Sequence, residues 1–470
     1  MKQAFILRLR PTHDYLNLMK NIRLTLLAAA SAAILLACES KEETETKVDT
    51  SELPAFASTY SPQPSETTLI TNARIIDGTG QEIENASLLM TDGKITAIGS
   101  DVSGDASLTI DAQGKYVTPG IIDIHSHLGN YPSPSVRAHG DGNEITSPIT
   151  SEVWAEHGVW PQDPGFDEAL QGGVTTLHVL PGSANLFGGR GITLRNVASR
   201  TVQGMKFPDA PYTLKMACGE NPKRVYGQKG GPGSRMGNVA GYRKNWIKAK
   251  AYQKKRAAGG DDFKRDLQLE TLAGVLDGDI LVQMHCYRAD EMVQILDIAK
   301  EFDYKVTAFH HAVEAYKIGD ILKDNDACAA MWADWYGFKM ESYDGIFENV
   351  PFVHAAGACA MIHSDDENGI QRLNQEVAKT WANGNRAGLN ISKAEAWKWL
   401  STNPAKALGI LEETGTLEAG KRGDVILWSD DPFTTYARPE KVFIDGALLF
   451  DKDSGLKPKS DFRLGYGEIE

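Results

Sequence analysis

Two patterns of apolar and polar positions alternate along the chain, and they predict different kinds of structure. From residue 67 to 117, short apolar runs are separated by turn residues such as Asp92-Gly93, which is typical of β-hairpins. The same pattern returns after residue 411. We therefore expect both flanks to form one small composite β-sandwich over residues 67–118 and 411–455.

Between these flanks, over residues 119–410, buried-strand patterns alternate with helical ones. The apolar run at residues 279–286 precedes a segment in which Met292, Ile295 and Phe302 recur on one helical face. Repeated units of this kind predict an α/β fold with a parallel sheet, and their number favours a (β/α)8 TIM-like barrel. No GxGxxG turn supports a dinucleotide-binding sheet.

The first 66 residues differ from the rest. Residues 19–38 have a basic start, an apolar run and an end in small residues before Cys38, which is typical of a lipoprotein-type signal segment over residues 1–38. Residues 39–66 read as a disordered, charged tether. We expect cleavage before Cys38, a lipid on its sulfur, and an exported protein anchored on the periplasmic side of a bacterial membrane.

Composition excludes some functions. The net charge of -13 argues against nucleic-acid binding, which needs a basic surface. Membrane contact is expected only through the lipid anchor, and a homo-oligomer is compatible with the sequence. The remaining cysteines lack metal-ligand spacing, so we expect buried free thiols rather than disulfides at Cys218, Cys286, Cys328 and Cys359.

Potential metal ligands follow several predicted strands. A barrel displays its functional side chains where strands end, and such ends carry imidazoles or carboxylates that suit Zn²⁺ or a similar divalent ion. These residues are His125, His127, Glu220, His285, His310, His311 and Asp365. A single histidine at a strand end is more often a core residue than a ligand. Potential ligands at five strand ends of one barrel are improbable by chance.

Other histidines have simpler interpretations. Because side chains alternate along a strand, His310 should face away from His311 and pack between strand and helix. His178 is expected in the core, whereas His363 either orients Asp365 or fills the barrel.

Several motifs together resemble the amidohydrolase superfamily, in its imidazolonepropionase-related and prolidase-like branch. They are PGIIDIHSHLG, GGVTTLHVLPGSANLFGG, GENPKRVYG, HCYRADE, HHAVEAYK, HSDD, NPAKALGI and GTLEAGKRGDVILW. The resemblance covers about residues 67–452. It implies a barrel with a composite β-sandwich, one or two divalent ions, with zinc expected, and hydrolysis at an amide-like or cyclic amidine carbon.

The resemblance also implies roles for individual residues. His125 and His127 would hold the first ion, His285 and His311 the second, and Asp365 would contact the first ion and the attacking water. Asp365 is then the catalytic residue, because one carboxylate can take the proton from water and pass it to the leaving nitrogen.

The bridging ligand is open between two residues. The family uses either a glutamate or a carboxylated lysine, and we favour Glu220 because it is expected at the end of a strand, with Lys215 as the alternative. The basic loop that follows offers Arg224, Tyr226 and Arg235 to bind a substrate carboxylate.

The sequence therefore predicts a hydrolase of a non-aromatic C–N bond in a small amide, such as an Xaa-Pro-like dipeptide or an N-acyl amino acid. One alternative is a deaminase or cyclic amide hydrolase with one metal ion. Another is a non-catalytic binding lipoprotein that keeps the barrel.

Overall fold

The computed structural model describes residues 54–133, 135–260 and 263–454. The expected signal segment, Cys38 and the first part of the expected tether lie outside these residues. Among the described helices, none is long and apolar enough to cross a membrane.

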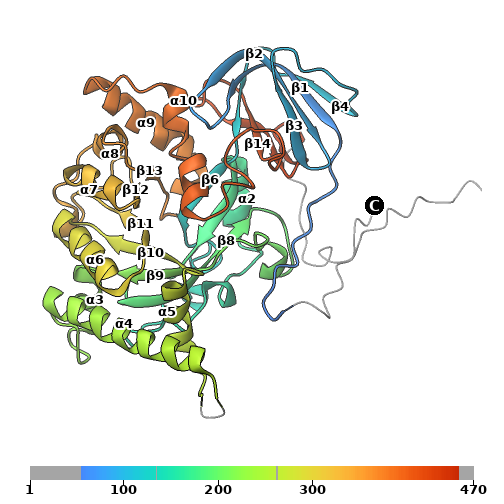
Figure 1. The fold of residues 1–470 in the computed structure, drawn as a ribbon. Coiled ribbons are helices and arrows are strands. Elements are labelled where there is room, and N and C mark those ends of the chain that lie inside the picture. The colour runs from blue at the N-terminus through green and yellow to red at the C-terminus, as the bar shows by residue number, and fades with distance from the viewer. Residues whose placement is uncertain (1–53, 134, 261–262, 455–470) are drawn as a thin grey trace, which may run out of the picture. The chain divides into compact units, whose positions relative to one another are not determined.

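One eight-stranded sheet curves into a nearly closed barrel (Figure 1). Its strands follow each other around the barrel in sequence order, with β6 and β13 at the two edges. They are β6 (Ile121–Ser126), β7 (Val174–Val179), β8 (Phe187–Arg195), β9 (Thr213–Ala217), β10 (Leu281–Cys286), β11 (Val306–His311), β12 (Cys328–Met331) and β13 (Ala360–Ile362).

The barrel departs from the expected all-parallel arrangement at β8. This strand pairs antiparallel with both β7 and β9, whereas the remaining pairs are parallel. Only residues 180–186 connect β7 to β8. A parallel neighbour needs a crossover of a dozen residues or more, so this short connection permits only an antiparallel return.

Side-chain and backbone bonds join the barrel's first and last strands. Asp123 on β6 accepts hydrogen bonds from the backbone N–H of Ser364 at 3.1 Å and from its hydroxyl at 2.5 Å. The N–H of Asp365 donates to the carbonyl of His125 at 3.0 Å. The ends of β6 and β13 are therefore held together beside the predicted ligands.

Helices cover the outside of the barrel. The longest, α4, ends at Ala258, and its buried face includes Tyr242 and Trp246. The helices are α2 (Pro164–Gln171), α3 (Glu220–Tyr226), α4 (Arg235–Ala258), α5 (Leu267–Asp277), α6 (Ala289–Phe302), α7 (Gly319–Asp324), α8 (Asn349–Ala355), α9 (Leu373–Arg386), α10 (Lys393–Trp397) and α11 (Thr402–Ala407).

A second eight-stranded sheet takes strands from both flanks of the barrel, where β5 pairs with both β1 and β14. Its apolar core includes Ile70, Leu88 and Phe443. Its strands are β1 (Thr68–Ile76), β2 (Glu82–Thr91), β3 (Lys94–Gly99), β4 (Leu108–Asp111), β5 (Tyr116–Pro119), β14 (Val425–Trp428), β15 (Pro439–Ile444) and β16 (Ala447–Asp451).

The end of the expected tether is packed rather than free. Ser58 donates a hydrogen bond to the carbonyl of Lys206, and the buried Tyr60 donates one to Asp445. An aromatic ring that buries its area and pairs its hydroxyl fixes this segment, so the expectation of disorder does not hold around residues 58–60.

The expectation of free thiols is also wrong, because two disulfides are present. Cys218 is bonded to Cys286, and Cys328 to Cys359. Both pairs join neighbouring strands or strand ends of the barrel, where parallel pairing brings residues 68 and 31 positions apart into contact. Sequence spacing alone did not reveal this proximity.

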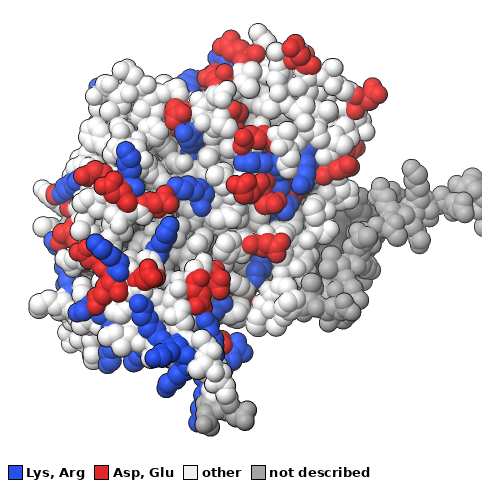
Figure 2. Space-filling view, in the orientation of Figure 1, with Lys and Arg blue, Asp and Glu red and all other residues white. Residues whose placement is uncertain are grey.

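Charges of both signs are mixed over the face shown in Figure 2. Lys and Arg side chains gather around α4, at the lower edge of this view.

Candidate metal centre and active site

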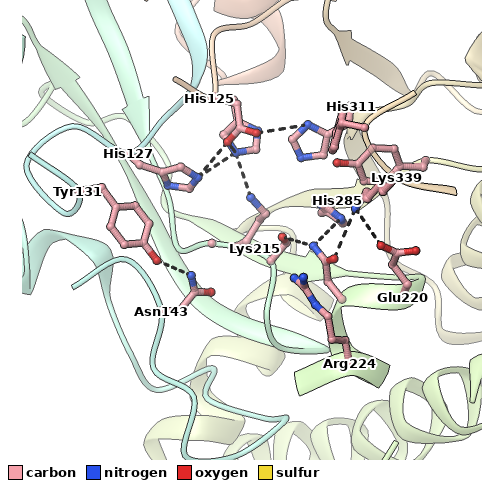
Figure 3. Close-up of a pocket in the computed structure, with 16 residues that line it drawn as sticks. His125, His127, Tyr131, Asn143, Lys215, Glu220, Arg224, His285, His311 and Lys339 are labelled. Atoms are coloured by element: carbon pink, nitrogen blue, oxygen red, sulfur yellow. Dashed lines mark hydrogen bonds and ion pairs between the residues drawn. The ribbon is translucent and has the colours of Figure 1, made fainter. Parts of the chain in front are cut away.

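The histidine pair of the HSH motif, His125 and His127, lies at the C-terminal end of β6 (Figure 3). The Nε2 atoms of His125 and His127 are 3.3 Å apart, and each lies 3.2 Å from Oδ1 of Asp365. The Nδ1 of His127 lies 2.8 Å from the carbonyl oxygen of Leu180. Since a carbonyl only accepts, Nδ1 carries a proton, and in the tautomer protonated there the lone pair of Nε2 faces Asp365.

Two further histidines complete the ring of imidazoles. The rings of His285 and His311 are 4.5 Å apart, and the Nδ1 atom of each is buried without a hydrogen-bond partner among the described residues. Burial holds the pKa of both imidazoles well below its usual range. Neutral rings with unused nitrogen atoms are suited to binding a cation.

His310 does not pack between strand and helix as expected. It pairs in register with His285, so its side chain faces the barrel interior, where its Nδ1 lies 2.9 Å from Nδ1 of His125. His311 also reaches the site, because its backbone has a positive φ of 67° that breaks the strand alternation. Two consecutive histidines therefore point to the same interior.

The two candidates for a bridging ligand occupy different places. The Nζ atom of Lys215 on β9 is buried 3.4 Å from Nε2 of His125. Glu220 is not in this strand but is the first residue of α3, and its carboxylate lies 3.9 Å from Nζ of Lys339. The geometry brings Lys215 rather than Glu220 to the histidines.

The pKa values of Lys215 and Asp365 are both lowered, but for different reasons. Burial lowers the pKa of Lys215 to about 7, and the nearby Asp365 opposes this shift. For Asp365, burial favours the neutral acid, but the surrounding imidazoles, His127 first and then His311 and His363, outweigh it and hold its pKa well below the usual range. Asp365 is therefore a carboxylate.

The donor set fits a divalent ion. Two overlapping groups have potential ligand atoms within 4.8 Å of one another: His125, His127 and Asp365, and His125, His311 and His363. Imidazole nitrogen and carboxylate oxygen are ordinary zinc ligands. In the first group the atoms that face each other are acceptors, so a bound cation would relieve their repulsion.

His363 lies in the same cluster, and both of its ring nitrogens are buried without a partner among the described residues. Its ring stacks on that of His125 with centroids 5.0 Å apart. His178 lies elsewhere in the barrel interior, where its nitrogens contact the hydroxyls of Thr193 at 3.2 Å and Thr213 at 2.9 Å. His178 thus has the core position that was expected.

A cavity of about 400 Å³ opens above the histidines. Its wall also carries Lys339, whose ammonium lies 3.4 Å from Oδ1 of Asn221 and 3.9 Å from the centre of the Tyr287 ring (Figure 3). The lining residues are His125, His127, Tyr131, Asn143, Gly182, Ser183, Lys215, Glu220, Asn221, Arg224, His285, Tyr287, His311, Phe338, Lys339 and Asp365.

Only one of the three predicted substrate-binding residues lines this cavity. Arg224 does so, whereas the buried Tyr226 accepts a hydrogen bond from Asn185 and Arg235 is paired with Glu291 and Glu341. Sequence reasoning missed Lys339, which lies in the loop after β12. The sequence indicated Lys339 only through the position of its loop, which follows the end of a barrel strand.

A barrel that gathers imidazoles, an amine and a carboxylate at its strand ends defines a class of metal-dependent hydrolases, and comparisons with known proteins agree. A model of the amidohydrolase family matches residues 342–449. The solved structure of an amidohydrolase from Thermotoga maritima is 32% identical with a TM-score of 0.76, and the match covers 82% of this chain and 100% of that one.

Two curated relatives extend the comparison. The amidohydrolase tasK of Hapsidospora irregularis is 32% identical over 78% of this chain, which spans only 39% of the length of tasK. An imidazolonepropionase of Mesorhizobium japonicum is 25% identical over 74% of this chain and 87% of its own length.

The chain belongs to the amidohydrolase family. It is therefore a hydrolase that acts on carbon–nitrogen bonds, within a superfamily of metal-dependent enzymes that typically use one or two divalent ions.

Proposed function

We propose that this protein hydrolyses the amide bond of a small amino-acid derivative, either a dipeptide such as Xaa-Pro or an N-acyl amino acid. The observation that carries the proposal is the convergence of His125 Nε2, His127 Nε2 and Asp365 Oδ1 within 3.3 Å at the base of a polar cavity. These three residues would hold a divalent ion. Asp365 would also be placed to accept and return a proton.

Zinc is the expected ion, with His125, His127 and Asp365 at one position and His285 and His311 at a second. We propose Lys215 in place of Glu220 as the bridge. Its buried neutral amine can attack CO₂, forming an N–C bond and releasing one proton, which leaves a carbamate with two ligand oxygens. The 3.4 Å separation from His125 supports this choice.

The chain's own residues account for positioning and proton transfer. When bound, a divalent ion supplies Lewis acidity toward the scissile carbonyl and lowers the pKa of water. Asp365 accepts the proton of the attacking water on a carboxylate oxygen and returns it to the leaving nitrogen.

Two cations recognise the other end of the substrate. Lys339 and Arg224 line the cavity and offer charge-assisted hydrogen bonds to a free carboxylate. Burial lowers the pKa of Lys339, and Glu341 and Glu220 oppose this shift. A substrate carboxylate would likewise stabilise its ammonium form.

The test is a library of dipeptides and N-acyl amino acids offered to the zinc-loaded protein. We expect hits with a free carboxylate and lower activity toward the matching amides. Asp365→Asn should reduce kcat about 10²–10⁴-fold, and Lys339→Met should raise KM while changing kcat less. An Asp365→Asn variant as fast as wild type would contradict the proton-transfer role.

A second candidate is hydrolysis of a cyclic amide at a single ion, which the similarity to imidazolonepropionase favours. Metal stoichiometry separates the two. We expect two ions per chain, falling to one in Lys215→Ala but not in Glu220→Gln. One ion in the wild type, unchanged by Lys215→Ala, would favour the cyclic amide hydrolase.

We also propose that the protein is exported and anchored by a lipid at Cys38. The two disulfides support this, because such bonds persist in oxidising compartments. Cys38→Ala should release the protein from the membrane fraction, whereas equal membrane recovery would contradict the anchor.

A further inference from the structure

Beneath the candidate metal centre, three buried side chains form a continuous line of hydrogen bonds. Nε2 of His310 lies 2.7 Å from Oε1 of Gln283, and Nδ1 of His310 lies 2.9 Å from Nδ1 of His125. All three residues are buried, so they bond to each other and not to bulk water.

The chemistry of Gln283 fixes the direction of these bonds. Its side-chain nitrogen faces the carbonyl oxygen of Ala407 at 3.4 Å, so the amide oxygen is the atom turned toward His310. The opposite orientation would place two oxygens against each other. Because the amide oxygen only accepts, Nε2 of His310 carries the proton.

The remaining atoms follow from this assignment. A neutral His310 with its proton on Nε2 has a lone pair on Nδ1, so Nδ1 of His125 must donate. His125 is then protonated on Nδ1, and its lone pair lies on Nε2. That atom lies 3.2 Å from Asp365 and 3.3 Å from Nε2 of His127.

We propose that Gln283 and His310 act as a tautomer relay that commits Nε2 of His125 to metal binding. Both are positioning residues, because neither lines the cavity. The inference rests on the proposed metal-dependent function. It assigns a role to His310, which the sequence analysis expected to pack between strand and helix, and to a glutamine with no predicted role. Removing a partner that orients a histidine ligand typically lowers metal affinity about 10–100-fold.

The experiment measures Zn²⁺ affinity by chelator competition, together with the visible spectrum of the Co²⁺-substituted protein. Gln283→Met removes the acceptor at similar volume and should weaken Zn²⁺ binding about 10–100-fold. Gln283→Glu keeps an acceptor oxygen in either protonation state and should restore most of the affinity. The Co²⁺ spectrum should change in Gln283→Met and remain close to wild type in Gln283→Glu.

A double-mutant cycle tests whether Gln283 acts through His310. We expect His310→Phe to lose at least as much affinity as Gln283→Met, and the double variant to lose no more than His310→Phe. Fully additive losses would contradict a relay. The thermal midpoint of each metal-free variant is measured in parallel, so that a folding defect is recognised.

Thr213→Val is the matched control. It removes the hydroxyl 2.9 Å from Nε2 of His178, a comparable buried imidazole contact outside the relay. Its Zn²⁺ affinity should equal that of wild type. A wild-type protein that binds no divalent ion would overturn the proposed function and the relay together. Unchanged affinity in Gln283→Met beside a metal-binding wild type would overturn the relay alone.

Discussion

Two buried clusters of polar side chains differ in how their atoms are paired. The arginine cluster, formed by Arg195, Asp424, Asp445 and Tyr60, connects the barrel to the second sheet. The metal-site cluster, at the barrel's strand ends, consists of His125, His127, Lys215, His285, His311, His363 and Asp365. Both bury groups that would be costly to remove from water unless they were compensated.

The arginine cluster supplies its own compensation. The guanidinium of Arg195 donates to Asp424 at 2.8 and 2.5 Å, and its Nη2 lies 3.2 Å from Asp445. Asp424 and Asp445 hold the pKa of this guanidinium well above its usual range despite its burial. Opposite charges lie side by side, which is the arrangement of a structural link.

The metal-site cluster lacks such compensation. His285 and His311 each have one unpartnered nitrogen and His363 has two, within the described part of the chain. Polar atoms left unpaired in this way reduce stability. In the arginine cluster the charges are paired, although Nε of Arg195 has no partner among the described residues. In the metal-site cluster the unpartnered atoms are imidazole nitrogens, which can bind a cation.

The largest loss of stability is expected when the arginine cluster loses its central cation. Arg195→Met leaves the buried Asp424 without its cation and Asp445 with Arg422 alone, and should lower the free energy of unfolding by about 3–5 kcal/mol. Urea denaturation measures this loss. As a control, Arg243→Met removes an exposed pair with Glu301 and should leave the midpoint nearly unchanged. Equal effects of the two variants would contradict the comparison.

The disulfide beside the metal-site cluster should have the next largest effect. Cys218→Ala with Cys286→Ala removes a bond across 68 residues and should lower the free energy of unfolding by about 2–4 kcal/mol. Denaturation with and without reductant checks it: the wild type should lose stability when reduced. A wild type indifferent to reductant would show that neither disulfide contributes.

Tyr60→Phe tests one hydrogen bond of the arginine cluster. The variant removes the hydroxyl that donates to Asp445 and keeps the ring, so it should cost about 1.5 kcal/mol. Urea denaturation again provides the measurement. A variant as stable as wild type would mean that Arg195 and Arg422 alone satisfy Asp445.

The smallest effect should have the opposite sign. His363→Leu replaces a buried imidazole with two unpartnered nitrogens and should stabilise the metal-free protein by about 1 kcal/mol. Thermal unfolding in the presence of a chelator measures the change. His178→Leu is its control, because both nitrogens of His178 have hydroxyl partners and their loss should destabilise. Destabilisation by both variants would contradict the comparison.

The gathering of these side chains at the strand ends could be predicted because local pattern determines it. His125, His127 and Asp365 each follow an apolar run, and the barrel brings strand ends to one place. The family resemblance added the order of the motifs. The alternation of side chains along a strand and the topology of a barrel were enough to predict where these residues lie.

The rest depended on backbone details and on contacts distant in sequence. The positive φ of His311 brings its side chain to the same interior as that of its neighbour His310, and no residue pattern indicates it. Glu220 seemed to end a strand, but the chain already turns into α3 there. Lys339 enters the cavity from a loop whose path is set by packing, which the sequence does not encode locally.

The closure of the barrel has a consequence for how the chain acquires its ion. Asp123 and Ser364 lie 241 residues apart in sequence, and their bonds adjoin His125 and Asp365. While a chain is still being made, His125 and His127 exist without their carboxylate partner. The complete ligand set appears only when β13 docks on β6, so tight metal uptake would report that the whole barrel has folded.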